Sequence, residues 1–303
     1  MNKEIDNIVN NHLDLFGISP KIEKINIGFT NTIYSVNDSY IVKICTNIDN
    51  EENFKNEIAF YQANKGNNLI PKMYYANTKK DNDLYYYEIL EKVTGVSLYN
   101  VWHTYSEKQR EDIIKQLCDA LKEIHSTKKE SYDWIKYMKD KFWELYKKVQ
   151  ELNVFNDDEK QLLEQAESYF DKYLKSDDFV LVHNDLHFDN IFVDNGKIKI
   201  IDFERSMIAP RDYDLDILYR MIRKPWKFAS EETEQFTSRK QYSHIMEYIG
   251  KYYPALVSNP DLYKRLGIYD IVYYLNSLLE YPKLEELKED VLNAAKIVVS
   301  KDI

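Results

Sequence analysis

The spacing of apolar and polar residues changes near residue 93, and this change predicts two structurally different parts. Before it, apolar residues alternate with polar ones over short runs bounded by Asn, Asp and Gly, a pattern typical of strands joined by tight turns. The runs predict strands at residues 22–27, 32–36, 40–45, 72–76 and 85–90. Helical spacing is found at residues 3–16 and 51–64. The first part is therefore predicted to be a sheet with one embedded helix, preceded by an N-terminal helix.

After Thr94 and Gly95, which we interpret as a connector, the spacing becomes helical. It predicts helices at residues 106–126, 132–152, 157–174, 231–252 and 261–299. Residues 179–203 form the lone β interruption. We therefore predict an α+β fold of two lobes: residues 1–93 form an N-terminal antiparallel-sheet lobe, and residues 94–303 form a mainly helical C-terminal lobe. A length of 303 residues fits two lobes, since single cores stop growing near ~250–300 residues.

The β interruption contains the strongest turn signal of the chain. Asn195-Gly196 is typical of a two-residue hairpin turn that pairs residue 194 with 197, so Asn190 is expected opposite Ile201. Asp202 is the next residue, and Asp185 lies in the polar loop before the hairpin. We therefore expect two carboxylates and one amide near the open end of this hairpin.

Oxygen donors of this kind suit a hard cation such as Mg²⁺. His183 and His187 flank the same loop and could be considered as zinc ligands. No thiol accompanies them, however, and a spacing of four residues brings two side chains to one face only in a helix. We expect both histidines to have structural roles.

The composition of the chain disfavours several classes of binding partner. The net charge of −10 repels nucleic-acid phosphates, so no nucleic acid is expected. Cys45 and Cys118 lack metal-type spacing and fit a reducing, cytoplasmic environment. The N-terminus has no apolar leader and the chain has no run of 18 apolar residues, so neither secretion nor a membrane is expected. We expect a monomer.

The polar loop and the following strand resemble kinases in their spacing. His183-x-Asp185, with Asn190 five residues later and then Asp202-Phe203 at a strand end, resembles a kinase catalytic loop and metal-binding segment. In detail, residues 182–191 (VHNDLHFDNI) and 200–204 (IIDFE) resemble the aminoglycoside phosphotransferase and choline kinase family, relatives of protein kinases that phosphorylate small molecules.

This resemblance implies a bilobal protein-kinase-like fold that uses Mg²⁺ and ATP or GTP, with a nucleotide-binding N-terminal lobe. It implies that Asp185 accepts the proton of the attacking hydroxyl, and that Asn190 and Asp202 hold Mg²⁺ against the phosphates. Asp214 matches the family's aspartate that supports the catalytic loop.

The nucleotide side has its own candidates. Alternation places Lys43 on one strand face with Ile41 and Cys45, where a lysine needs a partner. Glu57 on the next helix is the natural partner, with Glu51 and Glu52 left open as alternatives.

Two further segments are placed by their position in the kinase order. The turn before residue 32 has Gly28 as its one glycine, so Thr30 and Asn31 are either phosphate contacts or parts of a plain hairpin turn. Glu91 and Val93 would belong to a hinge whose backbone binds the purine.

Particular residues disfavour two rival functions. A protein kinase is disfavoured because Asn184 replaces Arg, Glu204 replaces Gly, and Ala209-Pro210 follows too soon for a long activation segment. A non-catalytic nucleotide-binding protein is disfavoured because the residues that match the catalytic and metal-binding residues of kinases are all present. Acidic residues outnumber basic ones in 177–216, which favours a cationic acceptor. We expect an aminoglycoside-like acceptor and hence a role in antibiotic resistance, with choline, ethanolamine or homoserine kinases as the alternative.

Overall fold

The computed structural model describes residues 3–25, 31–79, 86–126, 129–230 and 232–300. The chain divides into two compact units, here called unit 1 (Met1–Glu123 with His187–Met207) and unit 2 (Ile124–Leu186 with Ile208–Ile303). This division by contacts is not the lobe boundary predicted after residue 93, which stays a prediction. Within the described ranges, no helix is long and apolar enough to cross a membrane.

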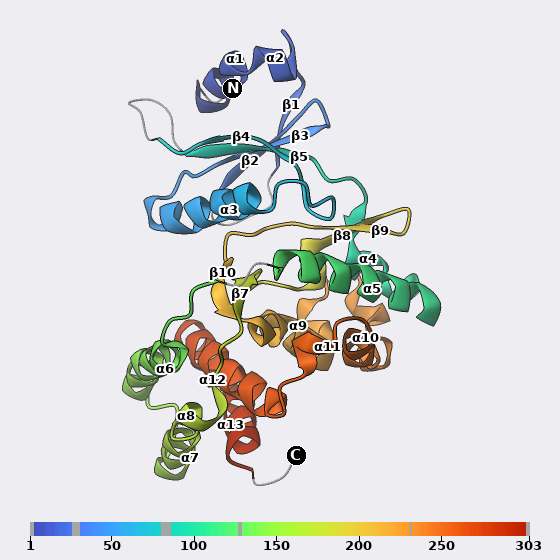
Figure 1. Ribbon diagram of the computed structural model, residues 1–303. Helices are drawn as coiled ribbons and strands as arrows, with labels where there is room; N and C mark the ends of the chain where they lie inside the picture. The colour runs from blue at the N-terminus through green and yellow to red at the C-terminus, as the bar shows by residue number, and fades with distance from the viewer. Residues whose placement is uncertain (1–2, 26–30, 80–85, 127–128, 231, 301–303) are drawn as a thin grey trace. The chain divides into compact units, whose positions relative to one another are not determined.

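Unit 1 contains a five-stranded antiparallel sheet in the order β1-β2-β3-β5-β4 (Figure 1). The strands are β1 (Ile22–Ile25), β2 (Thr32–Val36), β3 (Tyr40–Ile44), β4 (Met73–Asn77) and β5 (Tyr87–Glu91). All five predicted strands are present, and their bounds shift by a residue or two except at β2. The last two residues of the predicted first strand lie outside the described residues.

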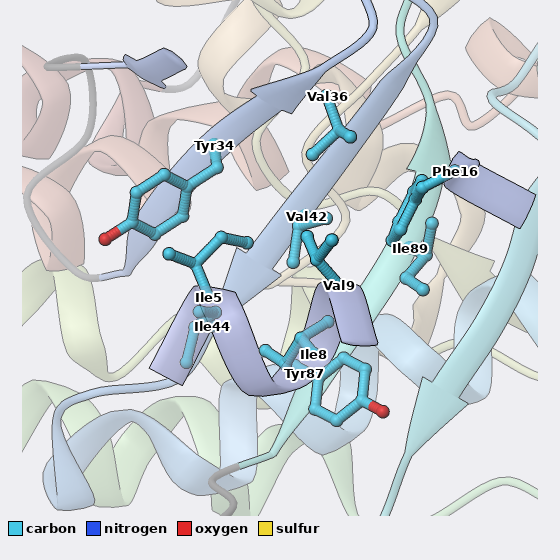
Figure 2. Close-up of a cluster of buried hydrophobic side chains, with 10 residues drawn as sticks. All are labelled: Ile5, Ile8, Val9, Phe16, Tyr34, Val36, Val42, Ile44, Tyr87 and Ile89. Atoms are coloured by element: carbon cyan, nitrogen blue, oxygen red, sulfur yellow. The ribbon is translucent and has the colours of Figure 1, made fainter. Parts of the chain in front are cut away.

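Helices cover both faces of this sheet. On one face, α1 (Lys3–Asn11) and α2 (Leu13–Phe16) place Ile5, Ile8 and Phe16 against Val42 and Ile89, as Figure 2 shows. On the other face, α3 (Glu51–Ala63) packs Phe54 and Ile58 against Cys45. Full burial of each of these side chains contributes roughly 1.5–3 kcal/mol. Val42 thus faces α1 and Cys45 faces α3, on opposite sides of the sheet, in agreement with the predicted alternation along this strand.

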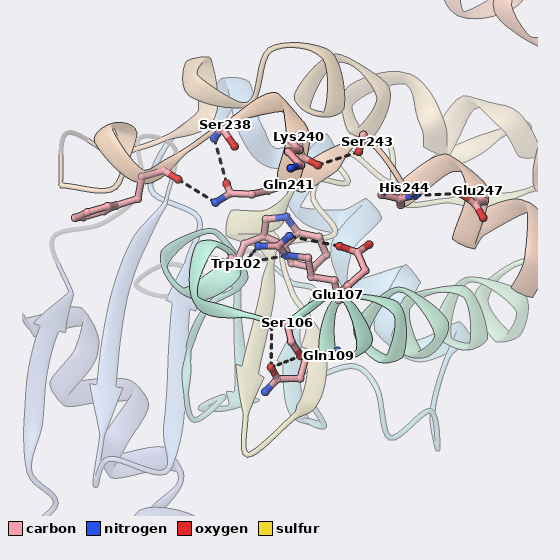
Figure 3. A network of polar contacts seen from close by, with 12 residues as sticks. Trp102, Ser106, Glu107, Gln109, Ser238, Lys240, Gln241, Ser243, His244 and Glu247 are labelled. Atoms are coloured by element: carbon pink, nitrogen blue, oxygen red, sulfur yellow. Dashed lines mark hydrogen bonds and ion pairs between the residues drawn. The ribbon is translucent and has the colours of Figure 1, made fainter.

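The connector leads into the rest of unit 1. Gly95 has φ +91°, and a Cβ there would lie 2.2 Å from the Val193 carbonyl oxygen, so this crossing needs glycine. A three-stranded sheet of order β6-β8-β9 follows, formed by β6 (Val96–Ser97), β8 (Ile191–Asp194) and β9 (Lys197–Ile200). The short helix α4 (Leu98–Val101) comes next along the chain, then the 3-10 turn η2 (Trp102–Thr104) and α5 (Glu107–Ile124). Figure 3 shows that Ser106 and Gln109 hydrogen-bond to each other where α5 begins.

Unit 2 is mainly helical, and most of its helices match the predicted ones. Its α-helices are α6 (Trp134–Glu151), α7 (Asp157–Glu167), α8 (Phe170–Tyr173), α9 (Leu215–Arg223), α10 (Ile245–Tyr252), α11 (Pro254–Val257), α12 (Leu262–Glu280) and α13 (Glu285–Val299). The strand β7 (Phe179–Val182) pairs with β10 (Met207–Pro210). Residues 179–203 are therefore not the lone β segment of the second part, because β6 and β10 also form strands there.

Four of the predicted helices are interrupted. Residues 3–16 form α1 and α2, and residues 157–174 form α7 and α8. Residues 261–299 form α12 and α13, separated at Tyr281 and Pro282, because proline cannot continue a helix from the preceding turn. Among residues 232–252 of the predicted helix 231–252, only α10 is α-helical. Before it, Ser238 and Gln241 form a capping box around the separate turn η7 (Arg239–Tyr242), which Figure 3 also shows.

Candidate active site

The hairpin of β8 and β9 has the predicted register. Asn195 and Gly196 adopt φ 48° and 76°, as a two-residue turn with both central residues left-handed requires. Ile191 pairs with Ile200, and the Ile201 N–H donates to the Asn190 carbonyl oxygen at 2.9 Å. Asn190, only 7% exposed, and the residue after Ile201 therefore lie at the open end of the hairpin, within unit 1.

Asp202 adopts an unusual backbone conformation at this end. Its φ is +66°, in the left-handed region that non-glycine residues rarely occupy. The next side chain, Phe203, is fully buried and stacks on Phe60 of α3, with ring centroids 3.8 Å apart. The packing of Phe203 against Phe60 thus stabilises the turn that contains Asp202.

The ammonium group of a buried lysine lies close to three carboxylates of this region. Lys43 Nζ lies 2.5 Å from Glu57 Oε2, 2.6 Å from Glu204 Oε1 and 3.6 Å from Asp202 Oδ1. Of the three glutamates considered as its helix partner, Glu57 is the one in contact. Burial opposes the charge of Lys43, but the surrounding carboxylates, Glu57 first, outweigh this effect and raise its pKa. Lys43 is therefore a fixed cation.

For Glu57, burial has a larger effect on the pKa than the neighbouring lysine has. Glu57 is 1% exposed, and burial raises its pKa to about 7 although Lys43 acts to lower it. Its other oxygen accepts a hydrogen bond from the Phe203 N–H at 3.4 Å. Glu57 thus connects α3 both to Lys43 and to the segment that carries Asp202.

Glu204 also belongs to the site, although the sequence did not predict its place there. In the sequence it stands out mainly as the residue that replaces a glycine. It accepts hydrogen bonds from the Asn31 amide and, at 3.5 Å, from the Asn50 amide, besides its ion pair with Lys43. Its position two residues after Asp202 was the available signal. Thr30, the other loop candidate, lies outside the described residues.

The donor set fits a hard divalent cation. Asp202 Oδ1 is shielded from solvent and has no hydrogen-bond partner among the described residues. Glu57, Asp202 and Glu204 form the one group of three metal-ligating side chains found in the described ranges, with ligand atoms within 4.8 Å of one another. Carboxylate oxygens are the ligands that Mg²⁺ prefers, and no histidine belongs to the group.

The loop that carries Asp185 belongs to unit 2. Asn184 adopts φ +60°, and its backbone N–H donates to Asp214 Oδ1 at 2.8 Å. The Asp185 N–H is 3.2 Å from Nδ1 of the fully buried His183, while the Asp185 side chain is partly exposed. His183 thus contacts the backbone of the loop that carries Asp185. His187, in unit 1, contacts the Asn190 amide at 3.3 Å.

The predicted hinge residues occupy the end of β5. The Glu91 carboxylate lies 2.5 Å from Lys199 Nζ and accepts from the Lys72 N–H at 3.0 Å, so its side chain is engaged within unit 1. The Glu91 N–H donates to the Lys72 carbonyl oxygen at 2.8 Å. Val93 follows the strand and is partly exposed.

An antiparallel-sheet unit whose buried lysine meets a helix glutamate, together with a mainly helical unit, defines a kinase-like phosphotransferase fold. The model of the phosphotransferase enzyme family (APH) matches residues 21–240 of the sequence, and the chain belongs to this family. Its members and relatives are small-molecule kinases, as the sequence pattern predicted.

Solved structures of the same fold cover nearly the whole chain. The ADP-bound aminoglycoside phosphotransferase APH(2'')-Ib is 17% identical, with a TM-score of 0.68 over 97% of this chain and 99% of that one. The streptomycin–ATP complex of APH(2'')-IIa is 16% identical, with a TM-score of 0.66 over 99% and 100%. A choline/ethanolamine kinase family protein from Mesorhizobium loti is 13% identical, with a TM-score of 0.57 over 98% and 95%. No curated protein sequence matches the chain.

Proposed function

We propose that this protein transfers the γ-phosphate of ATP or GTP to a hydroxyl group of a small, cationic acceptor. The observation that carries the proposal is the Lys43 cluster: a buried cation held by Glu57, 3.6 Å from a carboxylate oxygen of Asp202 that has no hydrogen-bond partner among the described residues. Such a cluster provides a positive charge that can bind phosphates, next to an oxygen that can bind a metal.

Each residue has a role in this proposal. Lys43, positioned by Glu57, binds the nucleotide phosphates, and Asn31 contacts them from the loop before β2. The backbone of Glu91 and Val93 binds the purine. Asn190 and Asp202 hold Mg²⁺, which neutralises developing charge on the transferred phosphoryl group when bound. The present partners of Lys43 are then partly exchanged for phosphate oxygens.

Asp185 is assigned the role of the base, because it is a partly exposed carboxylate on a loop whose backbone is held by buried groups. It orients the acceptor hydroxyl and accepts its proton as the oxygen attacks the γ-phosphorus, and the bond from that phosphorus to the nucleotide diphosphate breaks. The proton ends on Asp185 and is then released to solvent.

A cationic acceptor is supported by charge. The chain carries −10, and acidic residues outnumber basic ones in 177–216, the stretch that includes the proposed base and metal ligands. Structures of similar fold contain streptomycin and gentamicin. We therefore propose an aminoglycoside-like acceptor and a role in antibiotic resistance, acting as a monomer in the cytoplasm. The choline/ethanolamine kinase relative makes an amino alcohol the second candidate.

The test is a matrix of acceptors and nucleotides. Purified protein is incubated with Mg²⁺, ATP or GTP, and a panel of aminoglycosides, amino alcohols and neutral sugars, and phosphorylated products are identified by mass spectrometry. We expect transfer to an amine-containing acceptor, and loss of ~10²–10⁴ of the rate in Asp185→Ala. Turnover of neutral sugars alone would exclude the cationic acceptor, and no transfer at all would exclude the phosphotransferase proposal.

A further inference from the structure

A run of buried polar contacts lies behind the Asp185 loop, entirely within unit 2. Asp214 uses both carboxylate oxygens: Oδ1 accepts from the Asn184 N–H at 2.8 Å, and Oδ2 lies 2.8 Å from Nε2 of His125. The side chains of His125 and Asp214 are completely buried. His125 comes one residue after α5, 89 positions before Asp214 in the sequence, so only the fold reveals the pair.

If the His125 imidazole is neutral, the chemistry of its two partners determines which nitrogen carries the hydrogen. A carboxylate can only accept, so Nε2 of His125 must carry the hydrogen that faces Asp214. In a neutral imidazole Nδ1 is then an acceptor, and it lies 3.1 Å from the hydroxyl of Tyr253. Burial raises the pKa of Tyr253, so its hydroxyl keeps the proton that it donates to His125.

Arg211 completes the sequence of donors. Its Nη1 donates to the Tyr253 hydroxyl oxygen, and Asp178 holds the guanidinium at 2.6 and 2.9 Å. The hydrogen bonds therefore run in one direction, from Arg211 to Tyr253, from Tyr253 to His125, and from His125 to Asp214. With the other tautomer of His125, an imidazole lone pair would face the buried carboxylate, and Asp214 would lose a donor without gaining water.

We propose that Tyr253 is a positioning residue for Asp185: its hydroxyl holds His125 in the Nε2–H tautomer, which orients Asp214 and thereby the Asn184 backbone beside the base. The proposal rests on the proposed function of Asp185. Asn184 has φ +60°, a conformation that needs its surroundings to hold it, and the bond to Asp214 is the contact that does so at its N–H. Tyr253 is the single residue between α10 and α11, so the junction of these two helices supports the loop that carries the proposed base.

The direct test is nitrogen-15 NMR of the full-length protein labelled at histidine, which reports the tautomer of His125, assigned with His125→Gln. We expect the neutral Nε2–H form in the wild type and a mixture of tautomers in Tyr253→Phe, which keeps the ring and removes only the hydroxyl. A wild-type spectrum of the Nδ1–H form or of the imidazolium would overturn the proposal, and this reading needs no variant of Tyr253 to fold.

Kinetics of the same variant test the consequence. In Tyr253→Phe, kcat should fall about tenfold while the nucleotide Kd stays within about twofold, because the change affects the geometry of the base rather than the nucleotide site. Tyr252→Phe, one residue earlier, is the matched control and should keep both values. Unchanged kcat in a folded Tyr253→Phe overturns the positioning role alone. Absence of transfer by the wild type with every acceptor would instead remove the proposed function, and the positioning role with it.

Discussion

Glu88 offers a quantitative test of the electrostatics around Lys43. It lies on β5 directly opposite Lys43 of β3, so both side chains point to the same face of the sheet, and it is fully buried. Neither carboxylate oxygen of Glu88 has a hydrogen-bond partner among the described residues, and the charge of Glu57 acts on this carboxyl group. A buried carboxyl group without partners is destabilised in its charged form.

Burial, with the nearby charge of Glu57, raises the pKa of Glu88 well above the ordinary value of 4.5 and so favours its protonated form. A carboxyl group with a raised pKa stabilises the folded chain only at low pH. Its contribution is lost as the pH rises from 4.5 through the folded pKa, because the unfolded chain then binds one proton fewer.

Between pH 4.5 and the folded pKa, the titration of Glu88 alone should lower the free energy of unfolding by up to about 1.4 kcal/mol per pH unit. Glu88→Gln cannot ionise and should escape this loss, so its stability relative to the wild type should increase over the same range.

The assay is urea unfolding of both proteins at pH 5.5, 6.5 and 7.5 without nucleotide. Glu23→Gln, on the solvent-exposed edge strand β1, is the control and should show no such trend. A stability difference between Glu88→Gln and the wild type that stays constant with pH, or that shifts in favour of the wild type as the pH rises, would refute the reasoning.

Three further changes have defined outcomes. Gly95→Ala should destabilise the protein by about 2 kcal/mol or more in urea unfolding, since its Cβ meets the Val193 carbonyl at 2.2 Å, whereas Gly17→Ala meets nothing within 4 Å; equal losses would contradict this. Lys43→Met should cost about 3–5 kcal/mol by leaving buried carboxylates without their cation, and an unchanged urea midpoint would disprove it. Removal of Mg²⁺ with EDTA should abolish the thermal stabilisation by ATP or GTP, and stabilisation that persists without the metal would argue against the metal site.

The parts of the site that could be predicted from sequence are those set by local chemistry. The Asn195-Gly196 turn dictates its own geometry, so the pairing of β8 with β9 and the place of Asn190 followed directly. Alternation along β3 likewise placed Lys43 on the α3 face. These predictions needed only neighbouring residues.

Contacts between distant segments could not be predicted in this way. The pairing of Lys43 with Glu88 depends on how β5 returns beside β3 after more than one intervening element. The pair of His125 and Asp214 spans 89 positions, and neither residue carries a pattern that points to the other. Helix periodicity also extended through Pro282, where the apolar spacing continues but the backbone cannot.

We propose that the base and the metal site are provided by separate residues. The most direct test measures both the Mg²⁺–nucleotide Kd and the transfer rate for the wild type, Asp185→Ala and Asp202→Ala. We expect Asp185→Ala to keep the Kd within a few-fold while losing transfer, and Asp202→Ala to weaken Mg²⁺-dependent binding itself. Near-normal turnover in Asp185→Ala, or unchanged Mg²⁺–nucleotide binding in Asp202→Ala, would contradict the account.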